Sequence, residues 1–202
     1  MATPTAATLI TLMARRLMEA HRGLDVGGAA ERVYAVWANI CTFTEAWKEE
    51  LLINTVDQQS AYPLTPPYAG TIIRRIDRVR FPDSLMQIPV SLYTYDYPSA
   101  TLNFCFPSTE TKTAALSARI VLKPIVNDPS GVSPAYFMLW DEAVYTGAMA
   151  SIYGQSYKPW TDLEKAKSFT TDFEQFRGAI RGDVNREGTG RALQMQCTNV
   201  FA

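Results

Sequence analysis

The chain has 202 residues, of which 47% are hydrophobic and 19% are charged, and these values are typical of a folded globular protein. They exclude global disorder, which requires low hydrophobicity and a large net charge. The 19 basic and 20 acidic side chains give a formal net charge of −1, which argues against a protein that grips nucleic acid by neutralising phosphates.

Two helices are predicted at the N-terminus. The first is expected over residues 4–21, where apolar residues recur every three or four positions and Thr3 is placed to cap the helix. Gly23 then resembles a glycine C-cap. A short connector leads to a second helix, expected over residues 28–52, and two helices joined so closely are expected to pack antiparallel.

A β-rich segment is predicted next. From about residue 51 the sequence is rich in Pro, Thr, Tyr and β-branched residues, and helical spacing disappears. The segments between the expected strands leave no room for crossover helices, so we expect an antiparallel sheet or a small sandwich. The predicted strands are 52–56, 71–81, 90–95, 101–106 and 116–122, of which the last alternates most clearly.

Two more helices are predicted in the C-terminal half. Ser133 and Pro134 form a start signal for the third helix, and Gly147 within it is small enough to let another helix approach closely. The fourth helix begins with a capping box, residues 161–164. Its expected buried stripe is Leu163, Ala166, Phe169, Phe173, Phe176 and Ile180.

The predicted fold class is therefore α+β. Two N-terminal and two C-terminal helices are expected to form a four-helix bundle-like core, interrupted by an antiparallel β insertion and followed by an extended C-terminal tail. The corresponding boundaries are 1–50 and 133–185 for a discontinuous helical domain, 51–132 for the β insertion and 186–202 for the tail.

Residues suited to catalysis or metal binding are scarce in this sequence. The single histidine, His21, falls at the expected end of a helix, where a structural role is favoured. The three cysteines are far apart, which fits neither a disulfide framework nor a CxxC metal site. There is no phosphate-binding glycine loop and no GxSxG motif. We therefore predict no catalytic residue, no cofactor and no metal site, and no apolar run approaches the roughly 20 residues of a membrane span.

Four arginines within seven residues are candidate contacts to a partner. Arg74, Arg75, Arg78 and Arg80 surround Asp77 on a predicted strand, and arginine recognises both phosphates and carboxylates. A charged strand edge that blocks unwanted strand pairing explains the same residues equally well.

Two further sets of partner contacts are predicted near the C-terminus. Arg177 and Arg181 follow helical spacing, which suits the helix dipole and also offers anchors to an acidic partner. The tail contains apolar residues without helical period after a glycine-rich break, and burial against another chain is favoured over a frayed end or a last strand of the home sheet. These tail residues include Leu193, Met195, Val200 and Phe201.

Several short segments follow one another in a defined order between Leu9 and Gly190. They are Trp37 with Phe43-Thr44-Glu45-Ala46-Trp47, Tyr62-Pro63-Leu64, Ile120-Val121-Leu122-Lys123-Pro124, the helix from Trp140 to Gly154, Tyr157-Lys158-Pro159-Trp160, and Gly188-Thr189-Gly190. In this order they resemble the head-to-tail adaptor proteins of short-tailed bacteriophages, also described as head completion or tail tubular A-like connector proteins.

The resemblance implies a homo-oligomeric ring of about twelve copies at the head–tail junction of a virion. Such a ring docks under the portal protein and receives the tail nozzle or tail tube protein. DNA passes through its channel during ejection without sequence-specific binding. The chain is then made in the host cytoplasm and has no membrane partner. A C-terminal segment of these proteins commonly extends to the portal or to a neighbouring subunit, and residues 186–202 are placed for that role.

Two other function classes remain open from the residues alone. A binding module recognises a glycan or peptide through Tyr93, Tyr95 and Tyr97, although alternation in this segment favours a sheet face. A hydrolase that uses carboxylates has the least support, because no paired acid and base are recognisable in the sequence.

Overall fold

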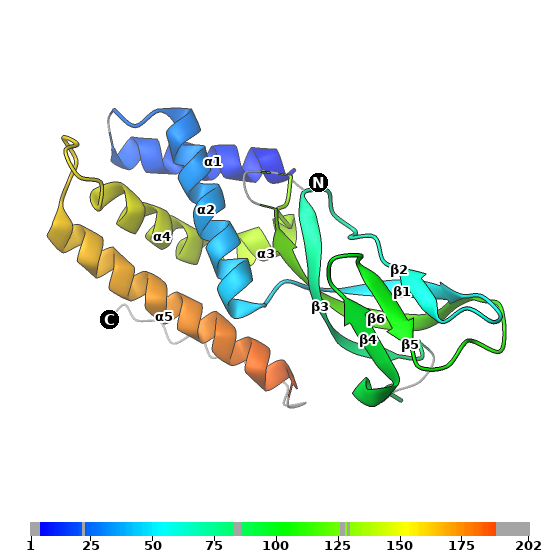
Figure 1. Ribbon diagram of the computed structural model, residues 1–202. Coiled ribbons are helices and arrows are strands. Elements are labelled where there is room, and N and C mark those ends of the chain that lie inside the picture. The colour runs from blue at the N-terminus through cyan, green and yellow to red at the C-terminus, as the bar shows by residue number, and fades with distance from the viewer. Residues whose placement is uncertain (1–4, 22, 83–85, 126–127, 129, 189–202) are drawn as a thin grey trace.

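The computed structural model describes residues 5–21, 23–82, 86–125, 128 and 130–188. In this part of the chain, five α-helices and two three-stranded antiparallel sheets form an α+β fold, which confirms the predicted fold class. Figure 1 shows the helices gathered on one side of the molecule and the strands extending from the other.

Helix α1 (Ala6–Ala20) begins two residues later than predicted. Its N-cap is Thr5, whose side chain accepts a hydrogen bond from the amide of Thr8, so the assignment of this role to Thr3 is wrong. The helix ends at His21, whose amide donates to two carbonyls of the last turn. Gly23 lies beyond this cap and turns the chain toward α2 with a φ of 109°, a conformation that favours glycine.

Helix α2 (Val26–Thr44) is shorter than predicted at its C-terminal end. Asp25 caps the start by accepting the amide of Gly28 at 2.7 Å. The helix stops because Glu45 adopts a left-handed conformation, with φ 54°. The residues that follow are extended, so the predicted helix end at residue 52 is placed too late.

The first sheet has the order β1-β6-β3, with antiparallel pairing throughout. Its strands are β1 (Lys48–Thr55), β6 (Lys112–Pro124) and β3 (Thr71–Arg80). The central strand β6 contains the segment with the clearest predicted alternation. Its residues Ile120 and Leu122 are completely buried, because one face of this sheet packs onto the core.

The second sheet has the order β2-β5-β4. Its strands are β2 (Ala61–Pro63), β5 (Thr101–Phe104) and β4 (Tyr93–Asp96). A 3-10 turn, η1 (Val90–Leu92), occupies the first half of the strand predicted at 90–95, and the predicted strand 101–106 ends at Phe104. Tyr95 of β4 donates its hydroxyl to the carbonyl of Ile73 in β3 at 3.0 Å, which ties the second sheet to the edge of the first.

The third predicted helix is broken into α3 (Pro134–Leu139) and α4 (Asp141–Tyr153), because Trp140 leaves the helical conformation. Helix α5 (Leu163–Gly188) extends beyond residue 186, where the tail was predicted to begin. The predicted capping box does not form: Asp162 accepts the amide of Lys165 at 3.0 Å, while Thr161 bonds to the preceding turn.

An aromatic cluster joins the helices to the first sheet. Trp37 of α2 lies with its ring centroid 5.6 Å from that of Trp47 and 5.7 Å from that of Trp140. The indole N–H of Trp37 donates to the carbonyl of Gly131 at 2.9 Å, and Gly131 in turn lies against the backbone of Gly70. The two connections between the helices and the strands therefore meet at this cluster.

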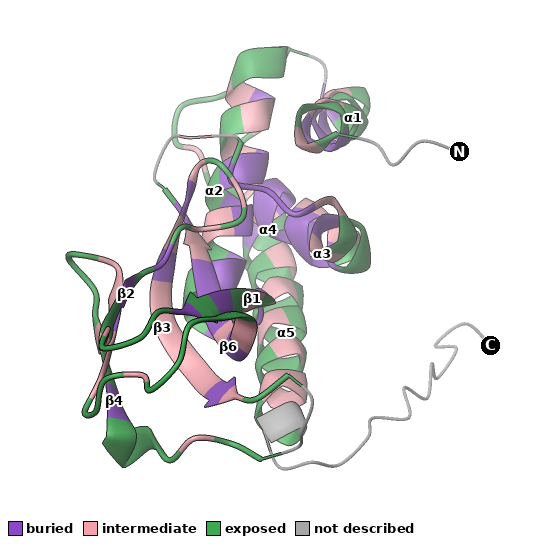
Figure 2. Cartoon of the chain, turned by 90° about the vertical axis from the view of Figure 1, so that its right-hand side faces the viewer, coloured by how far each residue is buried: buried purple, intermediate pink, exposed green. Residues whose placement is uncertain are grey.

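Helix α4 runs through the middle of the helical region, and α5 lies on its outside. A Cβ built at Gly147 of α4 would lie 2.6 Å from Val36 of α2 and 2.9 Å from Phe173 of α5, which confirms the predicted close approach of helices at this position. The predicted buried stripe of α5 is only partly covered, because Leu163 is 70% exposed and Phe176 is 41% exposed. Figure 2 shows intermediate and exposed residues along most of this helix.

Candidate interaction surfaces

His21 and Cys41, whose side chains are of types that often take part in catalysis, are both engaged in packing. His21 is buried, with its ring against the edge of Tyr153 at 4.6 Å between centroids. Burial raises the pKa of the Cys41 thiol well above its ordinary value, which keeps that thiol protonated. Among the residues that the structure describes, no group of three or more potential metal ligands comes together, and no helix is long and apolar enough to cross a membrane.

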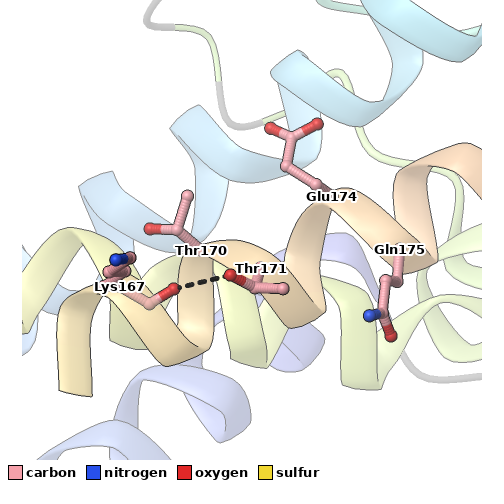
Figure 3. A pocket seen from close by; sticks show the side chains of 5 residues that line it. All are labelled: Lys167, Thr170, Thr171, Glu174 and Gln175. Carbon is pink, nitrogen blue, oxygen red and sulfur yellow. Dashed lines mark hydrogen bonds between the residues drawn. The ribbon is translucent and has the colours of Figure 1, made fainter. Parts of the chain in front are cut away.

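The hollows on the described surface are open depressions along helices. One of about 600 Å³ is lined by α5 alone, and Figure 3 shows its five side chains spread along the outside of that helix. They are Lys167, Thr170, Thr171, Glu174 and Gln175. Thr171 donates its hydroxyl to the carbonyl of Lys167 in the same helix, so these groups do not converge on a common point as catalytic groups do.

Two other hollows are grooves between helices. The larger, of about 1060 Å³, follows α2 and has a floor of small residues that includes Gly28, Ala35 and Ala38. The smaller, of about 240 Å³, lies between α1 and α3 and is lined mostly by apolar side chains such as Leu12 and Met138. Both have the shape of contact surfaces for another element of structure.

Strand β3 contains two β-bulges that decide where its arginines lie. The register with β6 shifts between Ile73 and Arg75 and again between Ile76 and Arg78. At a bulge, two residues of one strand face a single residue of its neighbour. Consequently the core-facing residues of β3 recur at every third position, as Ile73, Ile76 and Val79. The residues between them turn to the opposite face of the sheet.

Polar residues from all three strands of the first sheet share this opposite face. Glu50 of β1 is paired with Arg119 of β6, which is paired with Arg78 of β3, so the three lie in one row. We call the surface the arginine face. Its residues are Lys48, Glu50 and Leu52 of β1, Arg74, Arg75, Asp77, Arg78 and Arg80 of β3, and Ser117 and Arg119 of β6.

Carboxylates divide the arginine face into two ion-pair groups. In the first, Glu45 at the end of α2 accepts from Arg75 at 2.8 Å and from Arg74 at 3.3 Å. Asp77 accepts from Arg75 at 2.9 Å and from the buried Lys48 at 3.3 Å. These pairs fasten the end of α2 to β3, so two of the predicted partner contacts, Arg74 and Arg75, also hold the fold together.

In the second group, Glu50 is shared by two arginines. Its carboxylate lies 3.3 Å from Arg78 and 3.5 Å from Arg80, and Ser117 donates its hydroxyl to the same carboxylate. Burial works against ionisation of Glu50, but these hydrogen bonds and charges outweigh it and hold its pKa below the ordinary value. The carboxylate therefore stays charged at neutral pH.

Asp77 behaves in the same way. Burial disfavours its charged form, yet the charge of Lys48 and the hydrogen bond from Arg75 hold its pKa below the ordinary value. The pKa of Arg75 is raised, since its bonds to Glu45 and Asp77 outweigh the effect of burial. Both shifts favour the charged forms of Asp77 and Arg75, which form an ion pair at 2.9 Å.

The two predicted arginines of α5 have different surroundings. The Arg177 side chain is only 16% exposed, and its guanidinium lies 3.8 Å from the ring centroid of Phe43 in α2 and donates to Asn39 at 2.8 Å. Arg177 therefore fastens α5 to α2. Arg181 is exposed and lies farther from the same ring, at 5.0 Å. The predicted tail contacts Leu193, Met195, Val200 and Phe201 lie outside the described residues.

The tyrosines considered for ligand stacking lie mainly against β3. Tyr93 is buried, and its hydroxyl lies near the backbone of Val79. Tyr95 donates to Ile73, so the two side chains cover part of the β3 edge. Tyr97 is the exposed member of the three, which leaves the set without a shared stacking surface.

Sequence reasoning missed an exposed apolar tip at the β end of the molecule. Phe81, which follows β3, donates its amide to the carbonyl of Met86 at 3.4 Å, and Cys105 donates its amide to the carbonyl of Leu92 of η1 at 2.9 Å. Phe106 follows directly. The exposed apolar side chains of this tip are Phe81, Met86, Val90, Leu92 and Phe106. Their signal in the sequence is weak, because apolar residues in turns have no periodicity.

At the opposite end, the connector between α4 and α5 exposes Tyr157 fully and Leu163 largely. The molecule therefore presents apolar side chains at both of its far ends. Comparison of the chain with models of protein families and with curated proteins found no match. Its function is accordingly proposed from its own residues.

Proposed function

We propose that this chain is a structural virion protein, one subunit of a head-to-tail adaptor ring that links the portal to the tail nozzle and lines the DNA channel of a short-tailed bacteriophage. The order of segments from Leu9 to Gly190 supports this family. The observation that carries the proposal is the position of α5, the longest element of the described chain at 26 residues.

Helix α5 has little burial for its length. Among its residues with described exposure, only Ala166 is buried, while Leu163 and Phe176 keep much of their surface in solvent. Helices in proteins owe most of their stability to packing of an apolar face. A ring places each subunit between two neighbours, and such a neighbour would cover the outside of α5.

The two apolar ends suit a connector. The tip with Phe81, Met86 and Phe106 lies at the β end, and Tyr157 with Leu163 lies at the end of the helices. Exposed apolar patches on a soluble protein mark contact sites for other proteins. A subunit that joins a portal on one side to a nozzle on the other needs contact surfaces that are far apart.

The charge of the chain also supports a conduit. A formal net charge of −1 gives little general attraction for DNA, so DNA would pass the ring without being held. In this proposal the tail residues Leu193, Met195, Val200 and Phe201 are buried against the portal or a neighbouring subunit. Homo-oligomer, portal and nozzle are then the partners, and the head–tail junction of the virion is the location.

The test is assembly with the portal protein of the same virus. The two purified proteins are mixed, and the mass of the product is measured by light scattering and its shape by electron microscopy. A closed ring of about twelve copies seated on the portal is expected. If the two proteins stay separate at concentrations where portal rings are intact, the adaptor proposal is wrong.

Two matched variants sharpen this test. Leu163→Asp places a charge at the exposed end of α5, and Leu139→Asp does the same on α3, where the leucine is also largely exposed. Because both side chains are exposed, both variants should fold with unchanged thermal stability. Loss of ring closure in the α5 variant alone is expected, and equal behaviour of the two would contradict the role given to α5.

A further inference from the structure

We propose that the arginine face binds a surface of another protein that presents several carboxylates around an apolar side chain. This inference concerns a surface that the adaptor proposal does not assign, and it does not depend on portal binding. It rests on the charge of the face, on two arginines that share one carboxylate, and on an exposed leucine.

The arginine face carries a local excess of positive charge. In the described ion pairs of this face, the cations are Lys48, Arg74, Arg75, Arg78 and Arg80, and the carboxylates are Glu45, Glu50 and Asp77. Five cations therefore share three carboxylates in these pairs, although the whole chain has a net charge of −1. A concentration of one sign on one sheet face favours a partner of the opposite sign.

The arginines beside Glu50 retain hydrogen-bonding capacity. Arg78 and Arg80 share that single carboxylate, whereas one guanidinium alone can occupy both oxygens of a carboxylate. The side chains of Arg78 and Arg80 are each 31% exposed. An additional carboxylate can therefore approach them from solvent and balance the charge.

The residues around the arginines favour a protein partner over nucleic acid. Leu52 stands on the same face, is 60% exposed, and lies in one row with Ser117 and Arg80. An exposed leucine beside arginines is typical of protein interfaces, whose centres are apolar and rich in arginine.

The position of the face also suits docking. The two bulges of β3 gather its arginines without disturbing the core side, so the surface is held by a rigid sheet. Arg74 and Arg75 are fixed by Glu45 and Asp77, which leaves Arg78 and Arg80 as the arginines that share one carboxylate. Those two residues are the ones that the experiment changes.

The experiment measures binding of fluorescent probes to the full-length protein by anisotropy. The probes are a short peptide rich in glutamate with interspersed leucines, the same peptide with lysine in place of glutamate, and a DNA duplex of similar charge. The glutamate peptide should bind best, and its affinity should fall as salt is raised. Arg78→Glu with Arg80→Glu should weaken binding roughly tenfold or more, and Leu52→Asp should weaken it by a smaller factor.

Controls separate this surface from the rest of the molecule. Arg15→Glu reverses one positive charge at an exposed position of α1 and should leave binding unchanged. Arg78→Lys with Arg80→Lys keeps the positive charges and is expected to fold even if the glutamate variant does not. This variant should retain the part of the binding that depends on charge and lose the part that depends on the forked guanidinium geometry. Absence of glutamate-peptide binding, equal loss with Arg15→Glu, or tighter binding of the DNA would each overturn the proposal. The adaptor proposal is unaffected by any of these results, since its test uses the portal.

Discussion

The crossing of Gly70 and Gly131 offers a sharp test of how the helices are joined to the sheets. A Cβ at Gly131 would lie 3.0 Å from the carbonyl carbon of Gly70 and 3.4 Å from Cα of Pro124, and it would overlap the carbonyl oxygen of Gly70 more severely still. Nonbonded carbon atoms are at their optimum near 3.5–4.0 Å. The substitution Gly131→Ala therefore forces the two backbone segments apart.

This separation also strains two hydrogen bonds. The carbonyl of Gly70 accepts the amide of Ile125 at 2.8 Å, and the carbonyl of Gly131 accepts the indole of Trp37 at 2.9 Å. Overpacking costs about 1–3 kcal/mol, and each weakened hydrogen bond costs about 0.5–1.5 kcal/mol. Because these effects overlap, we expect Gly131→Ala to lower the free energy of unfolding by about 2–4 kcal/mol.

The assay is equilibrium unfolding in urea, followed by the fluorescence of the tryptophans at this junction. Gly178→Ala is the matched control, since a Cβ there has no atom within 4 Å and the residue lies inside α5. It should raise stability by about 0.5–1 kcal/mol, because alanine is the better helix former. A Gly131→Ala protein that unfolds at the wild-type urea concentration would refute the close crossing.

Three further predictions concern other parts of the chain. Burial, with a contribution from the charge of Lys165, holds the pKa of His21 below its ordinary value of 6.5, so the unfolded chain takes up the proton more readily than the folded one. The stability that the neutral imidazole supplies is complete above about pH 6.5 and is lost as the pH falls through the lower pKa of the folded state. In the His21→Gln variant, the free energy of unfolding should therefore depend less on pH between about pH 7 and pH 5.5. An unchanged pH dependence in that variant would contradict this role of His21. Arg177→Ala removes the contacts to Phe43 and Asn39 and should weaken the attachment of α5 by about 1–2 kcal/mol. Amide hydrogen exchange in α5 should then be faster than in the wild-type protein. An unchanged exchange rate in that helix would show that other residues hold α5. Deletion of the residues after Gly190 should leave the unfolding transition unchanged and abolish assembly on the portal, and normal assembly of the shortened chain would dismiss the role of the tail.

The fold class was predictable because the sequence changes its periodicity twice. Apolar residues at helical spacing give way to alternation near residue 51 and return near residue 133, and the structure follows these changes. Close packing at Gly147 was also predictable, since a glycine inside a helix has few reasons other than space. Such features depend on local sequence alone.

The end of α2 was not predictable in the same way. Trp47 continues the helical spacing of Trp37 and Thr44, so the pattern extends the helix past its true end. The structure buries Trp47 against Trp37 from extended backbone instead, after Glu45 has turned left-handed. Glutamate has no special preference for that conformation, and tertiary packing of the tryptophans therefore overrides the local signal.

For α5, periodicity identified the apolar stripe correctly but gave no information on what covers it. Ala166 and Phe173 pack onto α4 and α2, whereas Leu163 and Phe176 of the same predicted stripe remain largely exposed. A hydrophobic stripe records a need for burial in the working state of a protein. The chain itself leaves part of this stripe open, and a neighbouring subunit of the proposed ring would cover that part.

The arginine face shows how a surface can arise from an irregularity that residue patterns do not reveal. In a regular strand, the residues from Arg74 to Arg80 would alternate, and Arg74, Arg78 and Arg80 would share a face with Ile76 while Arg75 turned the other way. The two bulges send Ile76 to the core and bring Arg75 to the side of the other arginines. Spacing of three between Ile73, Ile76 and Val79 is the trace that the bulges leave in the sequence. The burial of Ile76 and the positions of the arginines on the arginine face depend on the same strand register. A change that removes one bulge must therefore move arginines toward the core. Selection for the arginine face would for this reason act on the core residues of β3 as well.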